Sequence, residues 1–261
     1  YYGPVVQQWA VQNGGWERVK KLDVGFDMEL FRELSITFDF FYDKRYNILL
    51  HREAWPQSLG FHGAKPWSNK GKVDNWGYEV STNWRKQLTK DLTVDFRGTF
   101  TYTQNKYIDL DEPIYPYVWQ TATGKPLNRR TGYIAEGLFQ SQEEIDNSPT
   151  QNLGSKPMPG DIKYRDVDGN GLIDSKDQVM ISKTAGMPRI QYGFGVNIDW
   201  KRFNFGVFFN GSAMRDIDIN GLHPFGQNDY NAMKFVAENR WTEANPNPNA
   251  EYPRLGLNDS Q

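Results

Sequence analysis

Twelve residues near the middle of the chain carry oxygen atoms at the spacing of a calcium-binding loop. The segment runs from Asp166 to Asp177 and has Gly171 at its sixth position, where such a loop must turn sharply. Calcium takes about six to eight oxygen ligands. The expected ligands are the side chains of Asp166, Asp168, Asn170, Asp174 and Asp177 and the main-chain carbonyl of Leu172. We therefore predict a Ca²⁺ site here, with Mg²⁺ as the other cation that these ligands suit.

The loop differs from an EF-hand in two respects. It ends on Asp177 where an EF-hand has the longer glutamate, and Pro159 precedes it where an EF-hand has its entering helix. These differences predict an isolated calcium loop and no EF-hand domain. The alternative is a solvated turn without metal, because Asp, Asn and Gly favour turns in any case.

Aromatic side chains in the segments between the predicted strands are candidates for substrate binding, because such rings stack on sugars. They are Trp55, Trp67, Tyr115, Tyr117 and Trp119. The alternative is that they pack the loops against each other or against a partner protein.

The composition excludes several functions. The chain has 261 residues, no cysteine and a net charge of −2, which excludes disulfides and thiolate chemistry and gives no electrostatic case for nucleic acid. Aromatic residues make up 15%, which favours strands and membrane interfaces. The three histidines stand in no catalytic spacing, so we predict no catalytic residues and no enzyme. No apolar run is long enough for a transmembrane helix.

Strict alternation of apolar and polar residues is the main periodicity, and it predicts antiparallel strands. The alternating segments form three pairs and are seven to eleven residues long, close to the roughly nine to eleven residues that a tilted membrane strand requires. They cover residues 22–30 and 34–40, 76–84 and 92–102, and 192–200 and 203–209.

Connections within each pair are short, and those between pairs are long. The short turns fall near Arg32-Glu33, between Lys86 and Lys90, and at Lys201-Arg202. Short turns at one rim and long loops at the other are typical of an outer-membrane barrel. The aromatic girdles would be Phe31, Trp84, Trp200 and Phe203 at the short-turn rim and Tyr42, Trp76, Tyr102 and Tyr192 at the other. A soluble β-sandwich alternates in the same way and stays the alternative fold.

Alternation is lost between Gln104 and Arg189, which we interpret as a long extracellular insertion that contains the calcium-type loop at 166–177. Ser141 is expected to cap a short helix that reaches Ile145, and residues 230–241 are expected to form another.

Six segments resemble the C-terminal half of the SusC-like TonB-dependent outer-membrane transporters of Bacteroidetes. They are Lys20–Phe26, Gly71–Glu79, Glu136–Gln140, Pro159–Asp174, Arg240–Pro246 and Tyr252–Leu255. The resemblance runs in order over nearly the whole chain. It implies an all-β chain that forms part of a large antiparallel transmembrane barrel of about 22 strands. It also implies location in the outer membrane, in contact with lipid.

The resemblance further implies TonB-dependent import of oligosaccharides or peptides, with a SusD-like surface lipoprotein as a lid. TonB would act through an N-terminal region that precedes Tyr1, so we expect the chain to be a barrel fragment. The alternative function is a soluble, calcium-stabilised carbohydrate-binding β-sandwich module. Nutrient uptake of a glycan or peptide is the function we predict.

Overall fold

The computed structural model describes residues 11, 14–54, 65–184, 186–217 and 233–255. The chain divides into two compact units, and each is described by itself. The sheet unit comprises Tyr1–Pro116, Thr121–Arg129 and Lys183–Asp216. The loop module comprises Tyr117–Gln120, Arg130–Ser182 and Ile217–Gln261.

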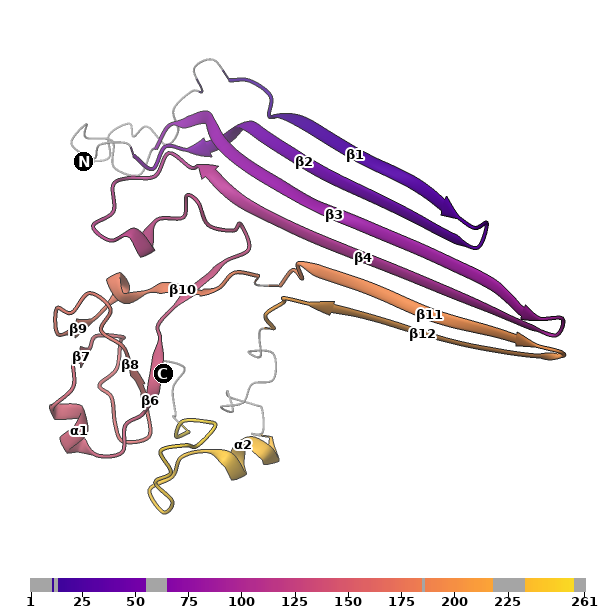
Figure 1. The fold of residues 1–261 in the computed structure, drawn as a ribbon. Helices are drawn as coiled ribbons and strands as arrows, with labels where there is room; N and C mark the ends of the chain where they lie inside the picture. The colour runs from indigo at the N-terminus through magenta and orange to yellow at the C-terminus, as the bar shows by residue number, and fades with distance from the viewer. Residues whose placement is uncertain (1–10, 12–13, 55–64, 185, 218–232, 256–261) are drawn as a thin grey trace, which may run out of the picture. The chain divides into compact units, whose positions relative to one another are not determined.

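Six antiparallel strands build the sheet unit, in the order β1-β2-β3-β4-β11-β12 (Figure 1). Their bounds are Arg18–Leu30, Leu34–His51, Trp67–Thr89, Leu92–Asp109, Ile190–Trp200 and Phe203–Ala213. Each strand pairs with the next one along the chain, except that β4 pairs with β11 across the long insertion. All six predicted strands and the all-β class are therefore confirmed. Within the described residues, no helix is long and apolar enough to cross a membrane.

Register places most apolar residues of the six strands on one face of the sheet. Phe26 lies opposite Phe38 and Phe38 opposite Val80, and the rings of Phe26 and Phe38 stack 5.5 Å apart. Farther across the sheet, Phe96 lies opposite Val196, which lies opposite Val207. Side chains alternate between the two faces of a strand, so the intervening positions share the opposite, mostly polar face. That face carries Asp39, Asp95, Asn197 and Asn204.

The apolar face of the sheet is uncovered. Phe26 is 54% exposed and Phe205 is 64% exposed, and Val24, Phe194 and Phe209 are exposed as well. A β-sandwich would bury this face against a second sheet. Figure 1 shows the six strands as a single layer. The alternative of a soluble sandwich is therefore wrong.

The short turns are tighter than the sequence indicates. Phe31 and Arg32 adopt positive φ between β1 and β2, and Lys201 does so between β11 and β12. The predicted turn between Lys86 and Lys90 is wrong, because β3 continues to Thr89 and only two residues separate it from β4. An irregularity between Gln87 and Thr89 shifts the register there. This shift disturbs the alternation that would have marked the strand.

Several strands extend past the aromatic row at the long-loop end of the sheet. Trp76 lies 5.5 Å from Tyr102 in this row, between ring centres. Beyond it, β2 continues to His51 and β4 to Asp109, whereas the sequence ends β4 near Gln104. These strand ends hold polar and apolar residues without strict alternation, as in Ile48-Leu49-Leu50 of β2 and Tyr107-Ile108 of β4, so hydrophobic alternation does not reveal them.

The loop module contains short elements around a small core. They are η2 (Val118–Gln120), β5 (Arg130–Gly132), β6 (Ala135–Leu138), α1 (Gln142–Asp146), β7 (Thr150–Gln151), β8 (Ile162–Tyr164), β9 (Leu172–Ile173), η3 (Ser175–Asp177), β10 (Val179–Ser182) and α2 (Lys234–Asn239). Antiparallel pairing joins β6 to β8 and β5 to β10, and β7 runs parallel to β9. The buried apolar side chains are Phe139, Ile173, Val236 and Trp241.

Both predicted short helices exist. The Ser141 hydroxyl accepts a hydrogen bond from the Glu144 amide at 3.2 Å, which confirms the cap of α1. The second helix, α2, is shorter than predicted, and residues 230–232 lie outside the described residues.

Residues after β12 complete the loop module. Trp241 lies against Gly160, where a Cβ would come within 2.3 Å of the ring, so only glycine fits there. The Trp241 indole donates to the Gln140 side chain at 3.1 Å. Arg254 forms an ion pair with the largely buried Asp161 at 2.6 Å. The sequence did not predict that these distant segments share a core.

Candidate functional site

Two glycines shape the turn of the calcium-type loop. Gly169 has φ +73° and Gly171 has φ +81°, a backbone conformation that L-residues rarely adopt. Asp166 accepts hydrogen bonds from both of their amides, each at 2.7 Å. These backbone donors, first that of Gly171, lower the pKa of Asp166 below its ordinary value. The loop is thus folded around an ionised carboxylate.

Asp177 holds the end of the loop to its beginning. Its side chain is fully buried. One carboxylate oxygen accepts from the amides of Val167 at 2.8 Å and Asp168 at 3.3 Å, and the other accepts from Asp174 at 2.9 Å. Asp174 in turn caps η3, so a reciprocal capping box joins Asp174 and Asp177. An aspartate at the last position, shorter than the glutamate of an EF-hand, is therefore long enough to accept these hydrogen bonds.

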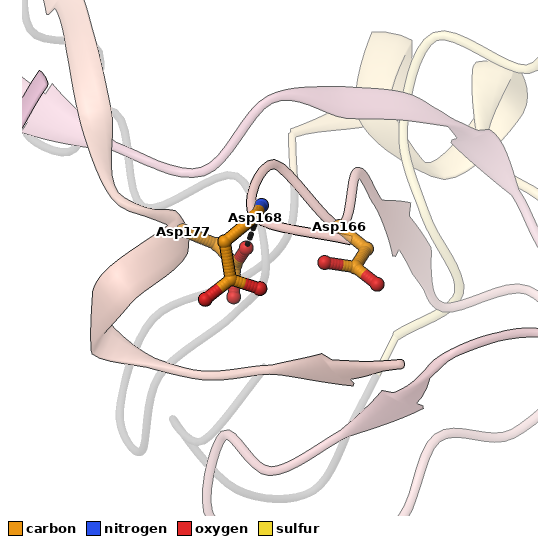
Figure 2. Close-up of side chains that lie close together, drawn as sticks. All are labelled: Asp166, Asp168 and Asp177. Carbon is orange, nitrogen blue, oxygen red and sulfur yellow. Dashed lines mark hydrogen bonds between the residues drawn. The ribbon is translucent and has the colours of Figure 1, made fainter. Parts of the chain in front are cut away.

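Three carboxylates converge at the loop. Oxygen atoms of Asp166, Asp168 and Asp177 all lie within 4.8 Å of one another. Figure 2 shows the three side chains, with the bond from the Asp168 amide to Asp177 dashed. Three negative charges this close repel one another, and a hard cation with oxygen ligands removes that repulsion. The carboxylates present fit Ca²⁺ or Mg²⁺.

The remaining predicted ligands lie on the same loop. The Asn170 carbonyl oxygen accepts from the Leu172 amide at 2.7 Å, and Asp174 accepts from the Lys176 amide at 2.7 Å. Leu172 begins β9, whose pairing with β7 holds it in place. The arrangement brings together Asp166, Asp168 and Asp177, while Asn170 and Asp174 are used in turns.

Two of the candidate aromatic residues contact this loop. The rings of Tyr117 and Trp119 stack 4.6 Å apart at an angle of 9°. The Trp119 indole donates to the carbonyl of Lys176 at 2.7 Å. A hydrogen bond to Asp168 raises the pKa of the Tyr117 hydroxyl. The pair therefore supports the metal-type loop, in line with the packing alternative.

The other candidate aromatics are placed elsewhere. Trp67 begins β3, and its ring lies 3.7 Å from that of His51, between ring centres. Tyr115 is exposed. Trp55 lies outside the described residues. These residues form no common site within the described part of the chain.

Sequence reasoning missed a cavity of about 350 Å³ in the sheet unit. It is lined by the end of β4, by Pro126 and Asn128, and by residues that include Lys183, Thr184, Arg189 and Gln191. The signal that could have indicated it is the pair of cations just before β11, in a chain whose net charge is close to zero.

The sequence is similar to receptors of outer-membrane transport. TonB-dependent receptor P3 of Formosa agariphila is 28% identical over 267 residues, which cover 97% of this chain and 26% of that protein. TonB-dependent receptor SusC of Bacteroides thetaiotaomicron is 26% identical over 220 residues, which cover 78% of this chain and 20% of that protein. No known family profile matches the sequence.

The fold is similar to that of a solved transporter. The structure described as the RagAB peptide transporter matches with a TM-score of 0.64 at 19% identity, over 92% of this chain and 26% of that one. At this identity the likeness shows the fold, which is that of a transmembrane barrel.

The chain spans about a quarter of the length of these relatives. They are receptors and transporters of the outer membrane and not enzymes, in agreement with the lack of catalytic spacing in the sequence. The exposed apolar face, the single-layered antiparallel sheet and the sequence match over nearly the whole chain agree with one another. The chain is similar to TonB-dependent receptors of the outer membrane, SusC among them, and has the fold of part of a transmembrane β-barrel.

Proposed function

We propose that the protein containing this chain imports oligosaccharides or peptides across the outer membrane with energy delivered through TonB. The uncovered apolar face of the six-stranded sheet carries this proposal, because such a face is stable in contact with lipid. The opposite, polar face would then line the route of the substrate. In this chain the sheet supplies barrel wall, and the loop module is its long extracellular insertion.

A SusD-like lipoprotein is the partner that we propose, acting as a lid on the extracellular side. The similarity to SusC supports this partner. TonB would act through a part of the relatives that this chain does not span. Peptides remain one of the two substrate classes, since the solved neighbour is described as a peptide transporter. The similarity to SusC itself does not select between peptides and glycans.

Uptake by the full-length protein tests the proposal. A strain that lacks the gene is complemented with it and is supplied with labelled peptides or oligosaccharides in parallel. Import of at least one class that requires both the gene and TonB is expected. Equal uptake with and without the gene for both classes would contradict the proposal.

We also propose that Ca²⁺, with Mg²⁺ as the second choice, orders the loop module. The converging carboxylates support this role, and so do the many backbone bonds that they accept. A cation there would fix the segment between β8 and β10, and with it the Tyr117–Trp119 pair. Calorimetry on the full-length protein at millimolar Ca²⁺ and Mg²⁺ tests binding. The absence of a heat of binding with either cation would contradict the proposed cation site.

A further inference from the structure

The cavity in the sheet unit arises because neighbouring strands end at different heights. Pairing of β11 with β4 stops where Ile190 lies opposite Tyr102, yet β4 continues to Asp109. The free edge of β4 is covered by two loop segments. The Thr103 amide donates to the carbonyl of Arg189 at 2.9 Å, and the Tyr107 amide donates to that of Lys125 at 3.0 Å. The cavity lies between these segments and the strand.

The cavity has a cationic and amide-rich lining. Lys183 and Arg189 are the charged residues of the lining, and none of its described residues is aspartate or glutamate. Within the described residues, neither cation forms an ion pair, although Arg189 donates to the carbonyl of Lys183 at 3.5 Å. The primary amides are those of Gln104, Asn105, Asn128 and Gln191. This combination offers many hydrogen-bond donors and an uncompensated positive charge.

The covering segment brings two more cations, Lys125 and Arg129, and the negative charge of Glu112 partly offsets them. Burial together with the charge of Arg129 lowers the pKa of Lys125. Two carboxylates beside these segments, Glu112 and Asp216, accept hydrogen bonds from other groups. Glu112 accepts from the amides of Ala122 and Thr123, at 2.7 and 2.8 Å, and Asp216 accepts from the Thr184 hydroxyl at 3.3 Å.

Several lining residues lie on the polar face of the sheet. Gln191 pairs with Thr101 and Thr103 pairs with Gly77, in the same rows as other polar positions. The polar face is the one that we assign to the substrate route. A molecule that moves along this face therefore meets the cavity at the long-loop end of β4.

We propose that this cavity binds a carboxylate group of the transported molecule. Lys183 and Arg189 would hold the two carboxylate oxygens, since a guanidinium matches a carboxylate in geometry and charge. The side-chain amides would bind the polar groups beside it. The carboxylate can belong to a peptide C-terminus or to an acidic sugar. This inference rests on the proposed import function.

Binding of matched ligand pairs to the purified full-length protein, by calorimetry, tests the cavity. One pair is a peptide with a free C-terminus and the same peptide amidated. The other is an oligogalacturonate and its methyl ester. The double variant Lys183→Gln and Arg189→Gln removes both charges while keeping polar side chains. The control Lys90→Gln removes a cation from the turn between β3 and β4, far along the strands from the cavity.

We expect the wild type and the control to prefer the carboxylate member of one pair by about tenfold, as for a charge-assisted contact. The double variant should bind both members of that pair alike. The pair that shows the preference identifies the source of the carboxylate. A preference that persists in the double variant would overturn the cavity assignment, as would equal binding of both members by the wild type. Wild-type protein that binds no member of either pair would instead count against the proposed import function, and the cavity assignment would fall with it.

Discussion

At the scale of single residues, Asp177 is both a predicted metal ligand and a residue that holds the loop together through hydrogen bonds. Its position in the sequence predicts a ligand, and the structure adds three backbone donors that hold it at full burial. Burying a carboxylate is costly unless it is hydrogen-bonded in this way. The candidate ligands of the loop were predictable from their spacing in the sequence. The hydrogen bonds to Asp177 were not, because they depend on how η3 folds back toward the start of the loop.

Asp168 is the cleaner residue for testing the cation. Replacement Asp168→Asn removes one charge and one oxygen ligand, but it leaves the bonds of Asp177 in place. We expect Ca²⁺ affinity to fall by roughly tenfold or more, because ligand charge sets affinity in such loops. Calorimetry with full-length protein measures the change.

The matched control is Asp146→Asn at the end of α1. This carboxylate bonds the Gln142 side chain at 2.9 Å and is remote from the loop in sequence. Its replacement should leave the calcium affinity unchanged. If both variants bind Ca²⁺ as the wild type does, the loop is a turn without metal.

A second residue, Asp111, connects two chain segments in the sheet unit. It accepts from Arg52 at 2.7 Å and from Lys70 at 2.9 Å. Burial alone would raise the pKa of Asp111, but the bonds from Arg52 and Lys70 outweigh it and lower the pKa. A carboxylate with a lowered pKa stabilises the fold above its unfolded-state pKa, and that contribution is lost as the pH falls through the folded value.

Asp111→Asn should therefore loosen the contact with Ala54, whose amide donates to the Asp111 carbonyl. We expect a loss of about 1 to 2 kcal/mol, since both cations stay partly hydrated. Hydrogen exchange at residues 52–54 is the measurement. Protection in the wild type should decrease as the pH is lowered below about 4, and the variant should lack this dependence. Identical pH profiles would show that the ion pairs contribute nothing.

At the scale of elements, the alternation of apolar and polar residues predicts the parts of the strands that face lipid. It does not predict the strand ends or all of the turns. The six strands and their two faces follow from the period of two, because lipid on one side and water on the other require it. The strand ends at His51 and Asp109 were missed, because apolar and polar residues do not alternate strictly there, as in Ile48-Leu49-Leu50. The turn between β3 and β4 was predicted too early in the sequence, because the irregularity before Thr89 breaks the alternation of apolar and polar residues.

Phe96→Arg tests the face that we assign to lipid. Phe96 lies near the middle of the alternating part of β4, residues 92–102, and pairs with Val196 on the apolar face. A cation near the middle of the bilayer costs roughly 2 to 4 kcal/mol. We expect less folded barrel in the outer membrane, measured by the heat-dependent gel shift of the full-length protein.

The control places the same residue on the polar face. Thr101 lies opposite Glu79 on β3, so Thr101→Arg would set a cation beside a carboxylate in water. Assembly of this variant should match the wild type. A stronger defect for Thr101→Arg than for Phe96→Arg would mean that the two faces are assigned in reverse.

At the scale of the whole molecule, the two units are interleaved along the chain. The sequence predicts one insertion between residues 104 and 189, and most of the loop module does come from it. The rest comes from residues after β12, through Trp241 and Arg254. No periodicity connects segments about a hundred residues apart, so this contact could not be predicted without structure.

Deleting residues 159–177 tests whether the loop module docks the SusD-like lid. The deletion removes Gly160, Asp161 and Ile173, and with them the core of the loop module. We expect weaker co-purification of the SusD-like lipoprotein, while the barrel still inserts because the six strands are intact. Pull-down of the tagged transporter, with the heat-dependent gel shift as the assembly control, measures both. Unchanged recovery of the lipoprotein from an inserted barrel would rule out docking through this module.

The contact of Trp241 with Gly160 also has a consequence for the order of folding. The chain leaves the loop module at Ser182, forms the hairpin of β11 and β12, and returns to the module with α2. Closing such a long loop costs entropy before any packing compensates for it. The module must therefore wait for its last segment, so its maturation should be among the slowest steps in the biogenesis of this region.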